Sequence, residues 1–237
     1  MLQTKISILD IGAGSGAMIY GLFSFFKSAS NFTVLPEIHV SYCSLEQQNL
    51  LQHHGLEFWK QYIENQNISA VNTYYRFKTI DLFTYGNNSN DRELPNNFFD
   101  FVVISHCIFA NEKQRIKSHQ VYRKIFTENL KDNGYVLIIV QGRRLFQAYS
   151  RELQDNQDQE DSLVKDFLNE LGLKLEWYKY IASTGERIPL GGAKFGNFAK
   201  KNLPVQPHMS LLLRQYLAQK YDSCYVLDDY AILAKKL

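Results

Sequence analysis

Cysteine is scarce in this sequence, and long apolar runs are missing. Only Cys43, Cys107 and Cys224 occur among its 237 residues, with no Cys-x-x-Cys pair. An odd, scattered set argues against a disulfide framework or a zinc site and predicts reduced thiols in a cytoplasmic protein without a metal. No apolar stretch reaches the roughly 18 to 20 residues that span a bilayer, so we expect no membrane insertion. A signal peptide is not expected either, because Asp10 and the nearby glycines interrupt any apolar leader core.

Charge of one sign is scarce as well. The sequence has 26 Lys and Arg against 24 Asp and Glu, a formal net charge of +2. This balance is too even to indicate a nucleic-acid partner by itself, and that question stays open. With 45% hydrophobic residues, the chain is long enough for one α/β domain with a well-buried core.

The most informative segment is a glycine-rich turn near the start of the chain. An apolar run over 5–11 leads into Gly12-Ala13-Gly14-Ser15-Gly16, and Asp10 precedes the first glycine. Only glycine lacks a Cβ, so such a turn lets a ligand lie almost against the protein backbone. The pattern predicts a strand that ends at a ligand-binding loop.

Strand and helix patterns alternate along the first 140 residues. Nearly unbroken apolar runs, typical of strands buried on both faces of a parallel sheet, are joined by segments of helical periodicity. We predict strands over 5–11, 37–44, 74–80, 98–104 and 135–140, and helices over 16–28, 47–65 and 118–130, with a turn at 132–134. This alternation indicates right-handed crossovers and a doubly wound α/β sheet.

The remainder of the chain departs from that alternation. We predict a helix over 158–171, a strand over 174–181, a helix over 209–220 and a final strand over 224–235, with a turn at Asp228-Asp229. About forty residues separate the last two strands, which exceeds ordinary connections. We therefore expect one domain, 1–237, with a lid or substrate-recognition insert at 183–224.

The spacing Asp-x-Gly-x-Gly-x-Gly resembles the first motif of the class I S-adenosylmethionine (SAM) methyltransferases. The resemblance covers roughly 5–140 well and implies a Rossmann-like sheet of about seven strands, mostly parallel with an antiparallel last strand and helices on both faces. It also implies SAM as cofactor, with the glycines beside its methionine part and Asp10 near its ammonium group. Glu46 would accept from the ribose hydroxyls, Asp81 and the Leu82 N–H would face adenine, and Ser105 would line the transfer site. The implied cofactor-binding residues are Asp10, Gly12, Gly14, Gly16, Glu46, Asp81, Leu82 and Ser105.

Other interpretations of these residues stay open. Gly12-x-Gly14-x-x-Ala17 also satisfies the dinucleotide fingerprint, but Asp10 would place negative charge beside a pyrophosphate. Glu46 also lies farther from the glycines than the ~20 residues of the NAD pattern. Glu46 and Asp81 could instead serve only as a helix-end carboxylate and a turn residue.

The acceptor is less well defined than the cofactor. A base is needed only if the acceptor loses a proton, and His106 and Glu112 are the candidates. The run Ser105-His106-Cys107-Ile108 lacks the Asn/Asp-Pro-Pro-aromatic motif of enzymes that methylate adenine amines. We expect methyl transfer to O or N of a small or medium metabolite (an EC 2.1.1-like transferase).

Two further hypotheses remain. The first is an RNA methyltransferase, because the run 194–201 interleaves basic and aromatic residues and Arg143 and Arg144 follow the fifth strand. The second is a methyltransferase-like protein that binds SAM without turnover.

Overall fold

The structure is a computed structural model that describes residues 5–30, 38–64, 71–79, 81–85, 94–151, 157–182 and 228–237. The predicted insert at 183–224, with its basic and aromatic run and its helix over 209–220, lies outside the described residues.

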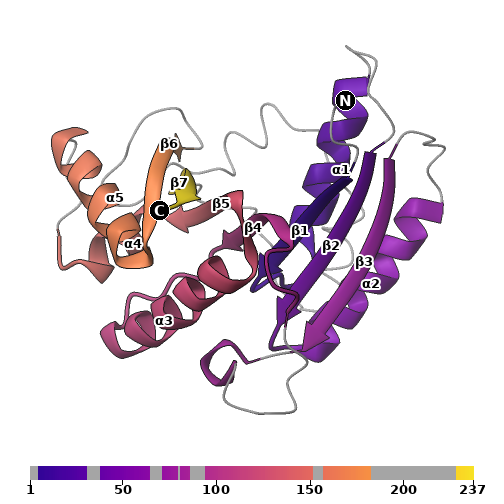
Figure 1. The fold of residues 1–237 in the computed structure, drawn as a ribbon, viewed down its shortest axis with the longest axis horizontal. Coiled ribbons are helices and arrows are strands. Elements are labelled where there is room, and N and C mark those ends of the chain that lie inside the picture. The colour runs from indigo at the N-terminus through magenta and orange to yellow at the C-terminus, as the bar shows by residue number, and fades with distance from the viewer. Residues whose placement is uncertain are drawn as a thin grey trace, which may run out of the picture.

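A seven-stranded sheet in the order β3-β2-β1-β4-β5-β7-β6 forms the centre of the described structure (Figure 1). β1 to β5 pair in parallel, whereas β7 is antiparallel to both of its neighbours, β5 and β6. The predicted Rossmann-like doubly wound sheet with an antiparallel last strand is thereby confirmed. The strands are β1 (Lys5–Ile11), β2 (Ile38–Glu46), β3 (Val71–Thr79), β4 (Phe99–Ser105), β5 (Leu130–Gln141), β6 (Leu173–Ala182) and β7 (Asp228–Lys236).

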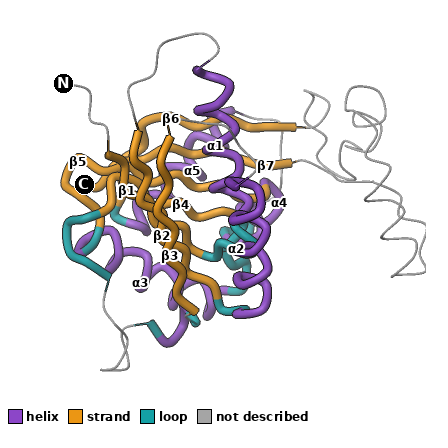
Figure 2. Tube along the Cα trace, turned by 90° about the vertical axis from the view of Figure 1, so that its right-hand side faces the viewer, coloured by secondary structure: helices purple, strands orange, loops and turns teal. Residues whose placement is uncertain are grey.

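Helices pack on both faces of this sheet (Figure 2). Successive strand side chains point to opposite faces, and the core divides accordingly. Ile8 of β1 packs with α1 and α2, whereas its neighbour Leu9 belongs to the cluster with α3 and α5. The helices are α1 (Ala17–Ser30), α2 (Asn49–Glu64), α3 (Glu112–Glu128), α4 (Gly142–Ala148) and α5 (Gln157–Leu171).

Helix α3 begins six residues earlier than predicted, at Glu112 rather than Ser118. Asn111 caps it, because its side-chain oxygen accepts a hydrogen bond from the backbone N–H of Gln114 at 3.2 Å. The polar first turn hides the apolar periodicity on which the prediction depended, while the cap itself is an ordinary N-terminal signal.

Two predicted turns are wrong. Residues 132–134 lie inside β5, where the pairing with β4 shifts between Phe99 and Phe101, so the turn signal marks a strand irregularity. Asp228 and Asp229 are the first residues of β7, paired with β6. The short helix α4, directly after β5, was not predicted.

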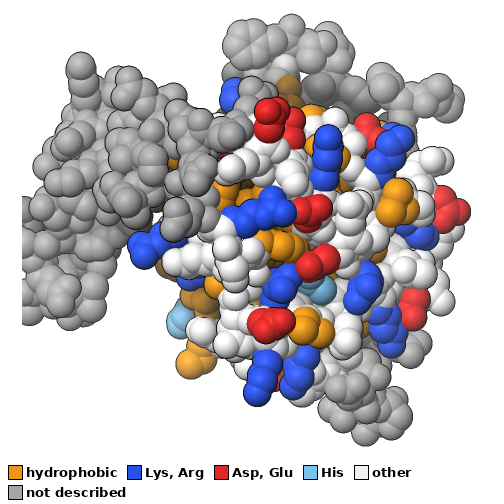
Figure 3. Space-filling view, turned by 90° about the vertical axis from the view of Figure 1, so that its left-hand side faces the viewer, with side chains coloured by type: hydrophobic (Ala, Val, Ile, Leu, Met, Phe, Trp, Pro, Cys, Tyr) orange, Lys and Arg blue, Asp and Glu red, His pale blue; other side chains and the backbone are white. Residues whose placement is uncertain are grey.

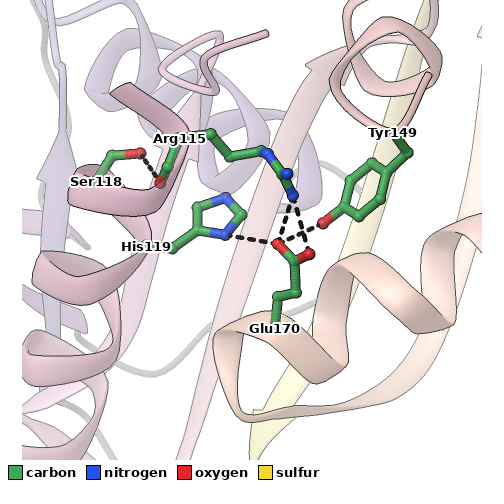
Figure 4. A network of polar contacts seen from close by, with 5 residues as sticks. All are labelled: Arg115, Ser118, His119, Tyr149 and Glu170. Atoms are coloured by element: carbon green, nitrogen blue, oxygen red, sulfur yellow. Dashed lines mark hydrogen bonds and ion pairs between the residues drawn. The ribbon is translucent and has the colours of Figure 1, made fainter. Parts of the chain in front are cut away.

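A polar network joins α3 to α5 on the side of the sheet away from α1 (Figure 4). Glu170 of α5 accepts from Arg115 at 2.7 and 2.9 Å, from the Tyr149 hydroxyl at 2.9 Å and from His119 Nδ1 at 3.1 Å. Arg115 also lies over the Tyr149 ring, 4.7 Å from its centre. Burial lowers the pKa of His119 to about 4, so its imidazole is neutral near neutral pH.

Candidate functional site

The glycine loop follows β1, the strand at which the order of the strands in the sheet reverses. β2 is on one side of β1 and β4 on the other, so this is the switch point at which open α/β sheets bind ligands. The loop is tied to the neighbouring strand because Leu45 O accepts from Gly12 N at 2.9 Å and Ala13 N at 3.2 Å.

Gly12 has no room for a side chain. Its φ is +71°, and a Cβ built there would lie 2.8 Å from Cys107 Sγ. Burial raises the pKa of the Cys107 thiol, so this sulfur is a neutral wall rather than a nucleophile. The absence of a side chain at Gly12 is thus required by the packing of the loop against Cys107, and both residues line the cavity.

A second glycine, which sequence reasoning missed, fixes the loop from behind. A Cβ on Gly55 of α2 would lie 2.1 Å from the Ser15 carbonyl oxygen, so α2 and the loop meet backbone to backbone. An isolated glycine within a helical pattern is the signal that could have indicated it.

Glu46 is the last residue of β2 and faces the glycine loop. Its Oε2 accepts from Gly14 N at 2.8 Å, and its Oε1 accepts from Gln48 N at 2.9 Å. A carboxylate has about four acceptor positions, so these two bonds leave capacity for a ligand. Glu46 therefore has the helix-end role considered for it, and its remaining acceptor positions are available to a ligand in the cavity that it lines.

Asp10 is fully buried beneath the loop and does not line the cavity. The Tyr42 hydroxyl donates to its Oδ2, whereas its Oδ1 accepts no hydrogen bond from the described residues. Burial, the largest effect, and the nearby Glu46 charge raise the pKa of Asp10 to about 6, against the lowering effect of Tyr42. Near neutral pH the fold therefore holds an ionised carboxylate that it compensates incompletely.

Asp81 follows β3 and caps a short helical turn, Leu82–Thr84, by accepting from Phe83 N at 3.0 Å. The turn-residue role is thus also present, and Asp81 and Leu82 both line the cavity. Phe83 stands against Phe109, with ring centres 5.1 Å apart. These two aromatic walls were not predicted.

His106 follows β4 in a left-handed conformation, with φ +55°, which is uncommon for residues other than glycine. Its backbone N–H donates to Ile139 O at 2.8 Å. Its Nε2 lies 3.7 Å from Oδ2 of Asp229, a buried residue of β7 that sequence reasoning missed. The signal for Asp229 is the pair of acids at 228–229 ahead of an apolar run, where the sequence pattern predicts a turn.

A cavity of about 320 Å³ brings most of the predicted residues together at the carboxyl edge of the sheet. Gly16 is buried with φ +83°, and Gly14 reaches the cavity only through Glu46. Glu112 is exposed at the start of α3 and does not line the cavity. The lining residues are Ile11, Gly12, Leu45, Glu46, Gln47, Asp81, Leu82, Phe83, Tyr85, Ser105, His106, Cys107 and Phe109.

The described residues contain no group of three or more His, Cys, Asp or Glu side chains that could hold a metal ion. None of the described helices is both long and apolar enough to cross a membrane.

Comparisons with known proteins give likenesses in structure only. No protein-family model matches the sequence, and no curated protein matches it. Similar solved structures include the 16S rRNA methyltransferase KamB (12% identity, 98% of this chain and 87% of that one, TM-score 0.49). A 30S ribosomal A1408 methyltransferase from an uncultured bacterium is 14% identical over 98% of this chain and 88% of that one, with a TM-score of 0.47. A TehB-like SAM-dependent methyltransferase from Corynebacterium glutamicum is 12% identical over 100% and 83%, with a TM-score of 0.44. At such identities the likeness is one of fold alone.

Proposed function

We propose that this chain is a SAM-dependent methyltransferase whose cofactor binds in the cavity at the carboxyl edge of β1, β2, β3 and β4. One observation carries the proposal: Gly12, Glu46 and Asp81 line the same cavity, although they lie at or just after the ends of three different strands. Ribose hydroxyls and an adenine amino group are donors, and these carboxylates are acceptors placed at the switch point.

The charge of the site fits a cation better than a dinucleotide. Glu46 and Asp81 line the cavity, and Asp10 is buried behind it. A pyrophosphate would meet two carboxylates there, with a third buried nearby, whereas SAM has no phosphate and carries positive charge on sulfur. Gly12 lines the cavity without a side chain, so its backbone is available for the close approach of the methionine part.

The sulfonium supplies an activated methyl group, so the protein has mainly to align the acceptor. Ser105 and His106 lie at the cavity end of β4. Of the two candidate bases, we assign proton removal to His106, because it lines the cavity and Glu112 does not.

For the acceptor, we propose O or N of a small or medium metabolite, in a cytoplasmic protein.

Calorimetry with SAM, S-adenosylhomocysteine and NADH tests the cofactor assignment. We expect the two adenosyl ligands to bind and NADH not to bind. Gly14→Arg should abolish binding, and Glu46→Ala should weaken it by about tenfold or more, the effect of roughly one good hydrogen bond to a charged group. Asp132→Asn, at an exposed side chain, is the control. SAM binding that neither Gly14→Arg nor Glu46→Ala affects would contradict the proposal.

Turnover is tested separately, by following tritium from methyl-labelled SAM into metabolite and RNA fractions of a cell extract. Label in a metabolite fraction supports the proposal. Binding without label in any fraction favours a protein that keeps the fold and has lost turnover.

An RNA acceptor is the second candidate. Arg143 and Arg144 are exposed at the start of α4, directly after the carboxyl end of β5. Against it, Figure 3 shows Lys and Arg interspersed with Asp and Glu on the face seen from the left of Figure 1, rather than one basic field. RNA affinity that falls steeply with salt and weakens in an Arg143→Gln, Arg144→Gln double variant would favour this candidate.

A further inference from the structure

The antiparallel direction of β7 brings a carboxylate from the far end of the chain to the edge of the sheet at which the cavity lies. Parallel strands present their carboxyl ends at one edge of the sheet, and an antiparallel strand presents its first residues there. Asp229 is the second residue of β7 and pairs with Gln141, the last residue of β5. It is therefore at the same edge as His106, although 123 positions separate the two residues.

The two side chains differ in exposure. The His106 side chain is 53% exposed and lines the cavity, whereas that of Asp229 is 10% exposed. The 3.7 Å between Nε2 and Oδ2 is an ion-pair distance, longer than a hydrogen bond. Catalytic contacts are often this long before ligands bind, and they tighten in the reacting complex.

The backbone of His106 is held in place independently of its side chain. Its φ of +55° is a sparsely populated conformation, and its N–H bond to Ile139 O anchors it to β5. Such residues persist where the surrounding structure fixes them, and they cluster at functional sites. Since β5 carries His106 through this bond and also pairs with β7, both partners are set by one strand.

We propose that Asp229 is the positioning residue for His106: it selects the Nε2–H form of the imidazole and stabilises the charge that His106 gains during transfer. This rests on the proposed function. Because Nε2 faces the carboxylate, Nδ1 remains the nitrogen that accepts a proton.

The step balances in atoms and charge. The acceptor O or N forms a bond to the methyl carbon, and the carbon–sulfur bond breaks with its electron pair going to sulfur. The acceptor proton goes to Nδ1 of His106. Positive charge thus leaves the sulfur and arises on the imidazole, where the Asp229 carboxylate faces it. The assignment restricts the acceptor to a class that loses a proton on methylation, such as a hydroxyl or a ring or amide N–H.

The test is the protonation pattern of the His106 ring, read from long-range nitrogen–proton NMR correlations in labelled protein. The sequence has 6 His, so His106→Gln assigns the signal. We expect Nε2–H in the wild type, with and without S-adenosylhomocysteine, and a shift toward Nδ1–H in Asp229→Asn. Asp132→Asn should leave the ring unchanged. A wild-type ring protonated at Nδ1, or a ring that Asp229→Asn does not change, overturns the proposal.

Turnover and binding separate this proposal from the proposed function. At saturating SAM we expect Asp229→Asn to lower kcat into the labelled fraction roughly 10- to 100-fold, part of the contribution of a general base. The Kd for SAM should change less than about twofold, and Asp229→Glu should recover part of kcat. A wild-type protein that does not bind SAM would refute the proposed function alone, since the protonation pattern of the His106 ring is measurable without ligand. If Asp229→Asn does not fold, the wild-type ring and Asp229→Glu decide the outcome.

Discussion

The glycine loop and the α3–α5 network each contain a carboxylate, but the two carboxylates differ in how many hydrogen-bond donors they receive. Glu170 accepts hydrogen bonds from Arg115, Tyr149 and His119. Burial acts to raise its pKa, yet the bonds from Tyr149 and Arg115 outweigh burial and lower it. Among the described residues Asp10 has one donor, Tyr42, and burial raises its pKa to about 6.

The Glu170 carboxylate therefore stabilises the fold, whereas the Asp10 carboxylate destabilises it. Three side chains of the described structure donate to the Glu170 carboxylate, so its benefit is stability. The charge of Asp10 costs the fold, since a shift from 3.8 to about 6 corresponds to roughly 3 kcal/mol. Uncompensated charge beside a ligand cavity is what a cationic ligand would relieve.

The largest effect is expected where the loop region packs most tightly. Gly55→Ala would press a methyl group against the Ser15 backbone, so we expect it to lower the free energy of unfolding by about 3 kcal/mol, as overpacking does. Gly21→Ala is the matched control: its Cβ meets nothing within 4 Å, and Ala should stabilise α1 by about 0.5 to 1 kcal/mol. Urea unfolding measures both. Equal effects of the two variants would show that α2 does not press on the loop.

The next effect has the opposite sign. Asp10→Asn removes the buried charge, so above pH 6 we expect the free protein to gain about 2 kcal/mol of stability, less than the full cost because the amide is also buried. Below pH 3.8 Asp10 is neutral in both states and the gain should vanish. SAM affinity should fall at the same time. A variant that is less stable than the wild type at neutral pH would contradict this assignment.

The sequence predicted the sheet and much of the cavity for one physical reason. Glu46, Asp81 and His106 each lie at or just after the end of a parallel strand, and the carboxyl ends of such strands meet at one edge. Asp229 could not be predicted this way, because its place depends on the antiparallel pairing with β5. Gly55 likewise gains its meaning only from contact with Ser15, forty residues earlier in the chain.

Removing the Glu170 charge from the network should lower the free energy of unfolding. Glu170→Gln keeps the shape but removes the negative charge that faces Arg115, so we expect a loss of about 1 kcal/mol, since the side chain is 41% exposed. The lowered pKa means that this contribution is present above pH 4.5 and is lost as pH falls. Urea unfolding should therefore show Glu170→Gln and Asp10→Asn with opposite signs at neutral pH, and both effects should shrink at acidic pH. Unchanged SAM affinity in Glu170→Gln would complete the contrast.

The smallest effect is expected within the same region, at an exposed ion pair. Arg151 contacts Asp166 at 2.5 Å, but the two side chains are 35% and 47% exposed. Exposed pairs contribute little because water screens them and two long side chains must be ordered. Arg151→Gln should therefore lower the free energy of unfolding by less than about 0.5 kcal/mol. If Arg151→Gln instead lowered the free energy of unfolding as much as Glu170→Gln, charge alone would account for the stability of the network. The convergence of three donors on the Glu170 carboxylate would then add nothing. A small effect of Arg151→Gln assigns the stability of this region to the convergence of three donors on Glu170. Asp10, with Tyr42 as its one donor among the described residues, lacks such a convergence.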